Sequence, residues 1–307
     1  MTASTRHVLK AAGTFGSFDL ALKAPPGPER DCLPPILFWP EPLRAGQEAD
    51  RFVAAVAAGL TQAGFNVVLP STPSLIRVEQ EALVLRAAAA ALREHAAVDA
   101  ERIALIGYSL GGLLVADRAA DCQPLHRVAL LAPTALETVT MIAASEHKKG
   151  GAKTSNGARS AKDVDTAETR SASNADASSE AADPSARHPV DGEAAVDLAA
   201  RWKTREAQAA VKKMRPVARL EALDCPVLIM HGAADAQAPA RIGGRWAWSA
   251  SQERDRPIES MLIARGDHTF SNSDVRGTCL SELLRFFAPM LGQSPPGSAK
   301  PRTDSAA

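Results

Sequence analysis

Residues 102–118, with the sequence RIALIGYSLGGLLVADR, constrain the fold more than any other stretch, because an apolar run passes through one sharp turn into a helical pattern. Arg102–Ile106 is a short aliphatic and β-branched run, which is typical of a strand buried on both faces of a parallel sheet. The turn Gly107–Gly111 has the spacing G-x-S-x-G, and Leu110–Arg118 follows as the helix. The segment therefore predicts a strand, a tight turn and a helix, with Ser109 at the corner.

The glycines around Ser109 suit a serine that takes part in chemistry. Gly107 and Gly111 have no Cβ, so strand and helix can approach closely and force Ser109 into an uncommon backbone conformation that presents its Oγ above the sheet edge. The first N–H groups of the helix have no intrahelical partner, so we expect the Leu110 amide to stabilise an oxyanion. The alternative is a Gly/Ser-rich turn without chemistry, because the motif also occurs by chance.

Apolar strands alternate with helical patterns along the rest of the chain. Strands are predicted at His7–Ala11, Phe18–Lys23, Leu33–Trp39, Phe65–Leu69, Arg127–Leu131, Pro226–Met230 and Ile258–Ala264. Helices are predicted at Gln47–Ala63, Ile76–His95, Ala194–Met214, Pro239–Ser251 and Asp274–Met290. The first two strands are expected to form an antiparallel edge. The alternation predicts the α/β class, with a mostly parallel, doubly wound sheet and helices on both faces. Active sites in such sheets lie at the carboxyl ends of the strands.

The composition changes abruptly near Ser145. From there to about Val190 the chain is rich in Ser, Ala, Gly, Lys and Asp, with almost nothing apolar to bury, which predicts disorder. We interpret this stretch as a tolerated insertion, and a lid over the site is the alternative. The expected core has two parts, residues 1–133 and 223–291. Residues 134–222 are expected to form a lid or insertion between them, with a low-complexity middle at about 145–192, and residues 292–307 are expected to form a loose tail.

Charge and cysteine content exclude several functional classes. Lys and Arg together number 35, as do Asp and Glu, so no net charge favours nucleic acid or an anionic membrane. Small neutral molecules remain open as substrates, and the catalytic set described below makes a small-molecule acyl substrate the expected partner. The four cysteines, Cys32, Cys122, Cys225 and Cys279, have no metal-ligand spacing and are expected to be buried thiols.

The chain shows no signal for export or membrane insertion. MTASTRHVLK has no apolar signal-peptide core, and no apolar stretch is long enough to cross a bilayer. We therefore expect a cytoplasmic protein without a membrane span. The sequence indicates no particular oligomeric state.

Two further residues complete a possible catalytic set with Ser109. A serine hydroxyl is a poor nucleophile, so it needs a neighbouring base, and that base needs an orienting group. Asp235 comes just after the strand Pro226–Met230, and His268 comes just after the last strand. Asp267 is an alternative acid, but immediate neighbours on a chain seldom place their side chains for such a hydrogen bond. We therefore predict that Asp235 orients His268.

Three motifs resemble those of the α/β-hydrolase superfamily. GYSLGG at 107–112 resembles its nucleophile elbow, CPVLIMHGAAD at 225–235 its acid strand, and GDHTF at 266–270 its histidine loop. The resemblance extends over nearly the whole chain outside the insert and tail, and it points to the esterase, dienelactone-hydrolase-like and serine-aminopeptidase-like groups. It implies the α/β-hydrolase fold.

The resemblance also implies roles for the three residues. Ser109 would be the nucleophile, His268 the general base and then acid, and Asp235 the carboxylate that fixes the imidazole tautomer. The expected activity is that of a serine hydrolase that cleaves an ester, thioester or amide through an acyl-enzyme, most readily an ester. No metal or organic cofactor is expected.

The sequence departs from the family pattern at Trp39-Pro40-Glu41-Pro42. Many members carry His-Gly there, followed by a backbone N–H that serves as the second oxyanion donor. Proline has no N–H, so Glu41 is the expected second donor beside Leu110, with its carboxylate turned away. Loss of one donor lowers the rate on the order of 10²–10³-fold. A catalytically weak binding or accessory protein with this fold is therefore the second hypothesis.

Overall fold

The computed structural model describes residues 6–13, 16–25, 33–40, 47–70, 78–95, 98–134, 205–238, 240–252 and 258–292. Several sequence expectations lie outside these residues: Glu41, Cys32, the low-complexity middle at 145–192, residues 194–204 of an expected helix, and all of the tail beyond Gly292. The assignment of 134–222 as a lid or insertion therefore stays a prediction.

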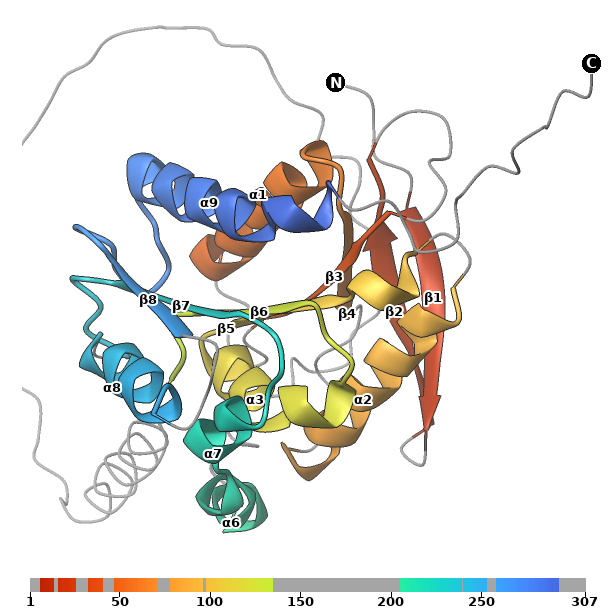
Figure 1. Cartoon of the computed structure of the whole chain (residues 1–307), viewed down its shortest axis with the longest axis horizontal. Helices are drawn as coiled ribbons and strands as arrows, with labels where there is room; N and C mark the ends of the chain where they lie inside the picture. Colours follow the sequence, from red (N-terminus) through yellow and green to blue (C-terminus); the bar gives the residue numbers. More distant parts are fainter. Residues whose placement is uncertain are drawn as a thin grey trace, which may run out of the picture. The chain divides into compact units, whose positions relative to one another are not determined.

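Eight strands form one sheet in the order β1-β2-β4-β3-β5-β6-β7-β8 (Figure 1). Their bounds are β1 Arg6–Gly13, β2 Gly16–Lys23, β3 Pro35–Trp39, β4 Asn66–Pro70, β5 Ala104–Tyr108, β6 Arg127–Leu131, β7 Val227–Gly232 and β8 Ile258–Ile263. Strand β2 pairs antiparallel with β1 and with β4, and every other pairing is parallel. The predicted mostly parallel α/β sheet with an antiparallel edge is confirmed.

The helices are α1 Gln47–Gln62, α2 Val78–Arg93, α3 Leu110–Arg118, α6 Arg205–Lys213, α7 Pro216–Glu221, α8 Arg241–Ala250 and α9 Ser273–Phe287. Short 3₁₀ turns occur at η2 Ala100–Arg102, η3 Ala119–Cys122 and η4 Ala288–Met290. The predicted strands and helices that fall on described residues are present, with ends shifted by a few residues. Helix α7 was not predicted; it is short and begins at Pro216, a favoured first helical residue.

The central strand begins two residues later than its apolar run suggested. The sequence placed the turn into this strand at Asp99–Arg102 and also took Arg102 as the first strand residue, whereas β5 begins at Ala104. The reason is an ion pair in the preceding turn: Asp99 accepts a hydrogen bond from the Glu101 amide at 3.0 Å, and Arg102 Nε lies 2.6 Å from Asp99 Oδ2. These contacts hold Ala100–Arg102 in a 3₁₀ turn instead of a strand.

Helices cover the sheet on both faces (Figure 1). Helices α1 and α9 pack on one face, and α2, α3, α7 and α8 lie on the other. Successive strand residues point to opposite faces of the sheet. Ile36 and Phe38 of β3 therefore pack in the core under α1 and α9, and Leu37 and Trp39 pack in the core on the other face. Both faces of the central strands are therefore buried, as their continuous apolar sequences predicted.

The parallel register brings the strand ends to one edge of the sheet. Tyr108 at the end of β5 is paired with Leu131 of β6, which is paired with Met230 of β7. Gly232, at the end of β7, is paired with Ile263 at the end of β8. The loops that follow these four strands consequently begin side by side, although they are far apart in the sequence.

Candidate active site

Ser109 is held at the corner between β5 and α3 in a strained backbone conformation. Its φ of 55° and ψ of −120° lie outside the usual regions for a residue with a side chain, as the sequence predicted. A serine that precedes a helix normally accepts a hydrogen bond from the first turn, but Ser109 makes no such side-chain cap. Its Oγ is therefore free to bond elsewhere.

Two glycines make this corner sterically possible. A Cβ on Gly107 would lie 2.7 Å from the carbonyl oxygen of Gly111. A Cβ on Gly111 would lie 2.4 Å from the carbonyl oxygen of Trp39, at the end of the neighbouring strand β3. Both contacts are with backbone atoms, which cannot rotate away. The glycines thus let α3 begin in contact with β5 and β3.

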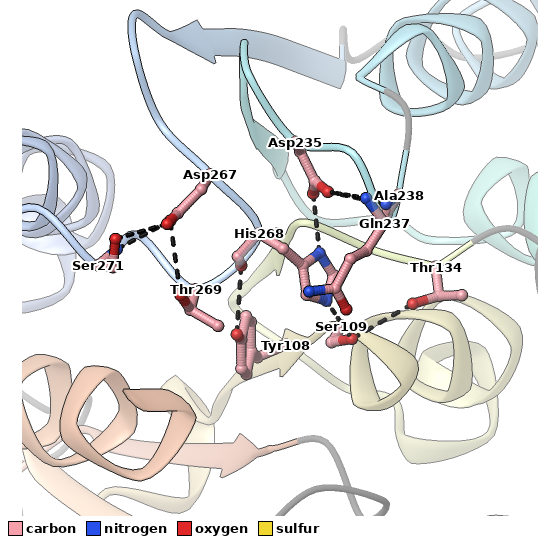
Figure 2. A network of polar contacts seen from close by, with 10 residues as sticks. All are labelled: Tyr108, Ser109, Thr134, Asp235, Gln237, Ala238, Asp267, His268, Thr269 and Ser271. Carbon is pink, nitrogen blue, oxygen red and sulfur yellow. Dashed lines mark hydrogen bonds and ion pairs between the residues drawn. The ribbon is translucent and has the colours of Figure 1, made fainter. Parts of the chain in front are cut away.

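The structure brings Ser109, His268 and Asp235 into one chain of hydrogen bonds (Figure 2). Ser109 Oγ lies 2.7 Å from His268 Nε2, and His268 Nδ1 lies 2.8 Å from Asp235 Oδ2. All three residues are buried. A carboxylate can only accept, so Nδ1 carries the proton and Nε2 is left to accept the serine hydroxyl. This is the tautomer that a general base requires.

Asp235 is itself fixed by its own loop. Its Oδ1 accepts hydrogen bonds from the backbone amides of Gln237 and Ala238, each at 2.8 Å. Its two oxygens therefore have different partners, one the backbone and the other the imidazole. The carboxylate cannot rotate without breaking three bonds.

Asp267, the alternative acid, faces away from the imidazole (Figure 2). It accepts hydrogen bonds from the Ser271 amide at 2.8 Å, from the Ser271 hydroxyl, and from Thr269 Oγ1 at 3.5 Å. Partial burial works in the opposite direction, but these hydrogen bonds lower the pKa of the Asp267 carboxyl below its usual value. Asp267 therefore stabilises the turn that carries His268.

Comparison with known proteins identifies the family of this chain. The sequence model described as alpha/beta hydrolase family matches residues 26–275. This chain belongs to the alpha/beta hydrolase family. The solved structures that resemble it include an esterase, a peptidase and a dienelactone hydrolase, which are the groups that the sequence motifs indicated. A search of curated proteins finds no significant match.

Three of these structures illustrate the likeness. Est1E from Butyrivibrio proteoclasticus has a TM-score of 0.61 at 16% identity, over 93% of this chain and 99% of its own. A puromycin-hydrolyzing peptidase from Mycobacterium tuberculosis has a TM-score of 0.61 at 17% identity, over 96% of this chain and 40% of its own. Dienelactone hydrolase from Anabaena variabilis has a TM-score of 0.55 at 12% identity, over 94% and 99%. At such low identity the likeness establishes the fold alone.

The loops that carry Asp235 and His268 are joined to each other. The Ala233 amide donates to the Ile263 carbonyl at 2.9 Å, and the Ala234 amide donates to the Gly266 carbonyl at 2.8 Å. A Cβ on Gly232 would lie 2.2 Å from the Gly266 carbonyl oxygen, so this approach needs a glycine. Sequence reasoning missed this contact. Its only signal is a glycine at the end of β7, Gly232, and another shortly after the end of β8, Gly266.

Two other contacts of the site were not predicted. Tyr108, next to Ser109, is buried and donates its hydroxyl to the His268 carbonyl at 3.2 Å (Figure 2). Thr134, three residues after β6, places its Oγ1 at 3.3 Å from Ser109 Oγ. The signal for Thr134 was its place after a strand that ends at the same sheet edge as Ser109.

The expected oxyanion donors lie partly within the described residues. Leu110 is the first residue of α3 and is buried beside Ser109. Its N–H belongs to the first turn, which has no intrahelical acceptor. Glu41 lies outside the described residues, so its role as second donor stays a prediction. The carbonyl oxygen of Pro40 lies close to Gly111, because a Cβ on Gly111 would be 2.5 Å from this oxygen.

Other ionisable groups near the site have different environments. His231 at the end of β7 is buried beside Gly243 of α8, and burial lowers its pKa to about 4, which keeps it neutral at ordinary pH. Cys122, Cys225 and Cys279 are buried thiols, as expected. Burial raises the pKa of the Cys122 and Cys279 thiols to about 12, so neither is a nucleophile at neutral pH.

Neither a metal centre nor a membrane helix is found in the part of the chain that the structure describes. No group of three or more His, Cys, Asp or Glu residues in this part could hold a metal ion. None of the described helices is long and apolar enough to cross a membrane.

A separate cleft of about 610 Å³ lies beside helices α7 and α8. Ser109, His268 and Asp235 do not line it. Trp248, which is 70% exposed, forms part of its wall. The residues around the cleft are Met214, Arg215, Pro216, Val217, Ala218, Glu221, Ile242, Arg245, Trp246, Trp248 and Ser249.

Proposed function

We propose that this protein is a serine hydrolase that cleaves an ester, thioester or amide bond of a small-molecule substrate through an acyl-enzyme, with esters preferred. The observation that carries the proposal is the continuous chain of hydrogen bonds from Ser109 through His268 to Asp235. The fold alone would not suffice, because one fold hosts many functions. The names of the similar structures, an esterase, a peptidase and a dienelactone hydrolase, support this range of bonds.

The first half of the reaction forms the acyl-enzyme. Ser109 Oγ attacks the substrate carbonyl carbon while its proton passes to His268 Nε2. The carbonyl oxygen becomes negatively charged, and the Leu110 amide stabilises it, together with the amide of Glu41. Collapse of this intermediate breaks the bond to the leaving group, which takes the proton from Nε2.

The second half releases the acid. A water molecule gives its proton to His268 Nε2 and attacks the acyl carbon, and the bond to Ser109 Oγ then breaks as Nε2 returns a proton to it. In both halves Asp235 accepts the hydrogen bond from His268 Nδ1–H and stabilises the positive imidazolium. The two backbone bonds to Oδ1 keep the carboxylate in position throughout.

The test is hydrolysis of p-nitrophenyl acyl esters, from acetate to decanoate, by wild type and Ser109→Ala, with labelling by a fluorophosphonate probe. We expect turnover and labelling in wild type and neither in Ser109→Ala. Ser281→Ala is the matched control, because Ser281 is an exposed serine on α9 whose hydroxyl bonds the Gly277 carbonyl. Wild-type rates in Ser109→Ala would refute the assignment.

A catalytically weak binding or accessory protein is the second candidate. The observation that favours it is Trp39-Pro40-Glu41-Pro42 in place of the usual His-Gly. A folded wild-type protein that neither labels with fluorophosphonate nor hydrolyses any ester of the series would support it. Labelling with slow turnover would instead support the hydrolase with one weakened oxyanion donor.

A further inference from the structure

The hydroxyl of Thr134 is a second group that reaches the oxygen of Ser109. Figure 2 shows Thr134 and His268 meeting Ser109 Oγ from different directions. Thr134 Oγ1 lies 3.3 Å from that oxygen, and His268 Nε2 lies 2.7 Å from it. Thr134 is only 9% exposed. A buried hydroxyl in this position needs a hydrogen-bond partner, and Ser109 Oγ is the partner that the structure offers.

Backbone contacts hold Thr134 against the elbow. The Thr134 amide donates to the Ser109 carbonyl at 3.1 Å, and the Ser109 amide donates to the Leu131 carbonyl at 2.9 Å. A Cβ on Gly112 would lie 3.0 Å from Pro133 Cα, so this glycine lets the segment after β6 approach α3 closely. The backbone of Thr134 is therefore held in place by its hydrogen bond to Ser109 and by the packing of Pro133 on α3.

The direction of the hydrogen bond follows from counting protons. Ser109 has one hydroxyl proton, and His268 Nε2 must accept it, because Nδ1 already donates to Asp235. Ser109 Oγ can then only accept from Thr134, and the Thr134 hydroxyl is the donor. The oxygen that attacks the substrate thus receives a hydrogen bond before the reaction begins.

We propose that this hydrogen bond from Thr134 stabilises the negative charge that develops on Ser109 Oγ, which makes Thr134 a further catalytic residue of the proposed hydrolase. The inference rests on the proposed function, since it concerns the same oxygen. During acylation the O–H bond breaks toward His268 Nε2 as the bond from Oγ to carbon forms, so Oγ carries excess charge in between. During deacylation the bond from Oγ to carbon breaks, and Oγ receives the electron pair.

The hydrogen bond is stronger in these two transition states than in the states between them. In the acyl-enzyme Oγ is an ester oxygen, which is a weaker acceptor than a partly charged oxygen. An interaction of this kind raises the rate of the chemical steps and does not tighten substrate binding. The 3.3 Å separation is longer than the usual 2.7–2.8 Å for two hydroxyls, and bonds of this type in free enzymes shorten in the reacting complex.

The test compares Thr134→Val, which keeps the shape and removes the hydroxyl, with Thr134→Ser, which keeps the hydroxyl and removes the methyl group. We expect Thr134→Val to lower kcat about 10-fold with KM nearly unchanged, as for the loss of one hydrogen bond. Thr134→Ser should retain most of kcat. The rate of fluorophosphonate labelling, which needs only attack by Oγ, should fall with kcat in Thr134→Val and recover in Thr134→Ser.

Several outcomes would overturn the proposal. Wild-type kcat in a folded Thr134→Val would show that the hydroxyl is not needed, and equal impairment of both variants would show that retaining the hydroxyl does not preserve the rate. If Thr134→Val does not fold, Thr134→Ala removes the same hydroxyl, and wild-type kcat there has the same meaning. Failure of the proposed function is distinguishable, because wild type itself would then show neither turnover nor labelling.

Discussion

Asp235 uses each of its carboxylate oxygens for a different purpose, which makes Asp235→Asn a specific test. Oδ1 accepts two backbone N–H groups, so the oxygen of an asparagine must stay there, and its NH₂ group must face His268 Nδ1. Nδ1 would then have to accept, which leaves Nε2 protonated and unable to take the proton of Ser109. We expect kcat to fall about 10⁴-fold, measured on p-nitrophenyl acetate.

Asp267→Asn is the matched control, since it makes the same chemical change at the adjacent carboxylate. Asp267 bonds Ser271 and Thr269 and makes no hydrogen bond to the His268 ring. We expect this variant to keep near-wild-type kcat. Equal losses in both variants would contradict the role of Asp235 as the residue that orients His268.

At the residue scale, the sequence was informative where a reactive side chain directly follows an apolar strand. Ser109, Asp235 and His268 could be picked out because parallel strands end at one sheet edge. Thr134 occupies an equivalent place, but threonine belongs to no motif there. Its contact with Ser109 depends on the close packing of Gly112 on Pro133, which no local sequence pattern reveals.

At the scale of elements, the first turn of α3 is in contact with the end of β3, and Gly111→Ala tests that contact. The added methyl group would lie 2.4 Å from the Trp39 carbonyl oxygen and 2.5 Å from that of Pro40, so the backbone would have to shift. We expect loss of activity and a decrease of about 3 kcal/mol in the free energy of unfolding, measured by urea denaturation.

Gly277→Ala is the same substitution as Gly111→Ala, but we expect it to raise stability instead of lowering it. Gly277 is exposed within α9, and a Cβ there would meet nothing within 4 Å. Alanine is favoured over glycine inside a helix by about 0.5–1 kcal/mol, so this variant should be more stable than wild type with unchanged activity. A stable, active Gly111→Ala would contradict the packing described for the elbow.

Element types were predictable because the apolar pattern changes period between strands and helices. The two-residue shift in the start of β5 has a tertiary cause: besides its pair with Asp99, Arg102 donates a hydrogen bond to the Met290 carbonyl, 188 residues away. A contact with so distant a segment cannot be predicted from the local sequence. Helix α7 is only six residues long, too short for a helical period to be recognised.

At the scale of the whole molecule, the order of the strands could not be derived from the sequence. The alternation of strands and helices predicts parallel pairing, but the order β4-β3-β5 requires the chain to return past β3 after forming β4. This crossover places β3 beside β5, with Trp39 paired to Gly107. The candidate site lies at the carboxyl end of β5, next to this change of direction, as is general for open α/β sheets.

The acid stability of the whole fold should depend on His231. Burial lowers its pKa from 6.5 to about 4 in the folded protein. Between these values the unfolded chain binds a proton that the folded chain does not, so unfolding becomes easier as the pH falls. The loss in the free energy of unfolding that His231 causes is absent above pH 6.5. It reaches about 3 kcal/mol near pH 4, at 1.36 kcal/mol per pH unit.

The measurement is the free energy of unfolding in urea from pH 7.5 to about 4.5, for wild type and His231→Gln. Glutamine does not titrate, so the variant should lose less stability over this range than wild type, whatever its stability at pH 7.5. Asp267→Asn is the control: because the folded pKa of Asp267 lies below its ordinary 3.8, its contribution is lost only at lower pH, and the Asp267→Asn curve should run parallel to wild type. Parallel curves for wild type and His231→Gln would mean that His231 accepts a proton in the folded state and that the β7 end is open to water.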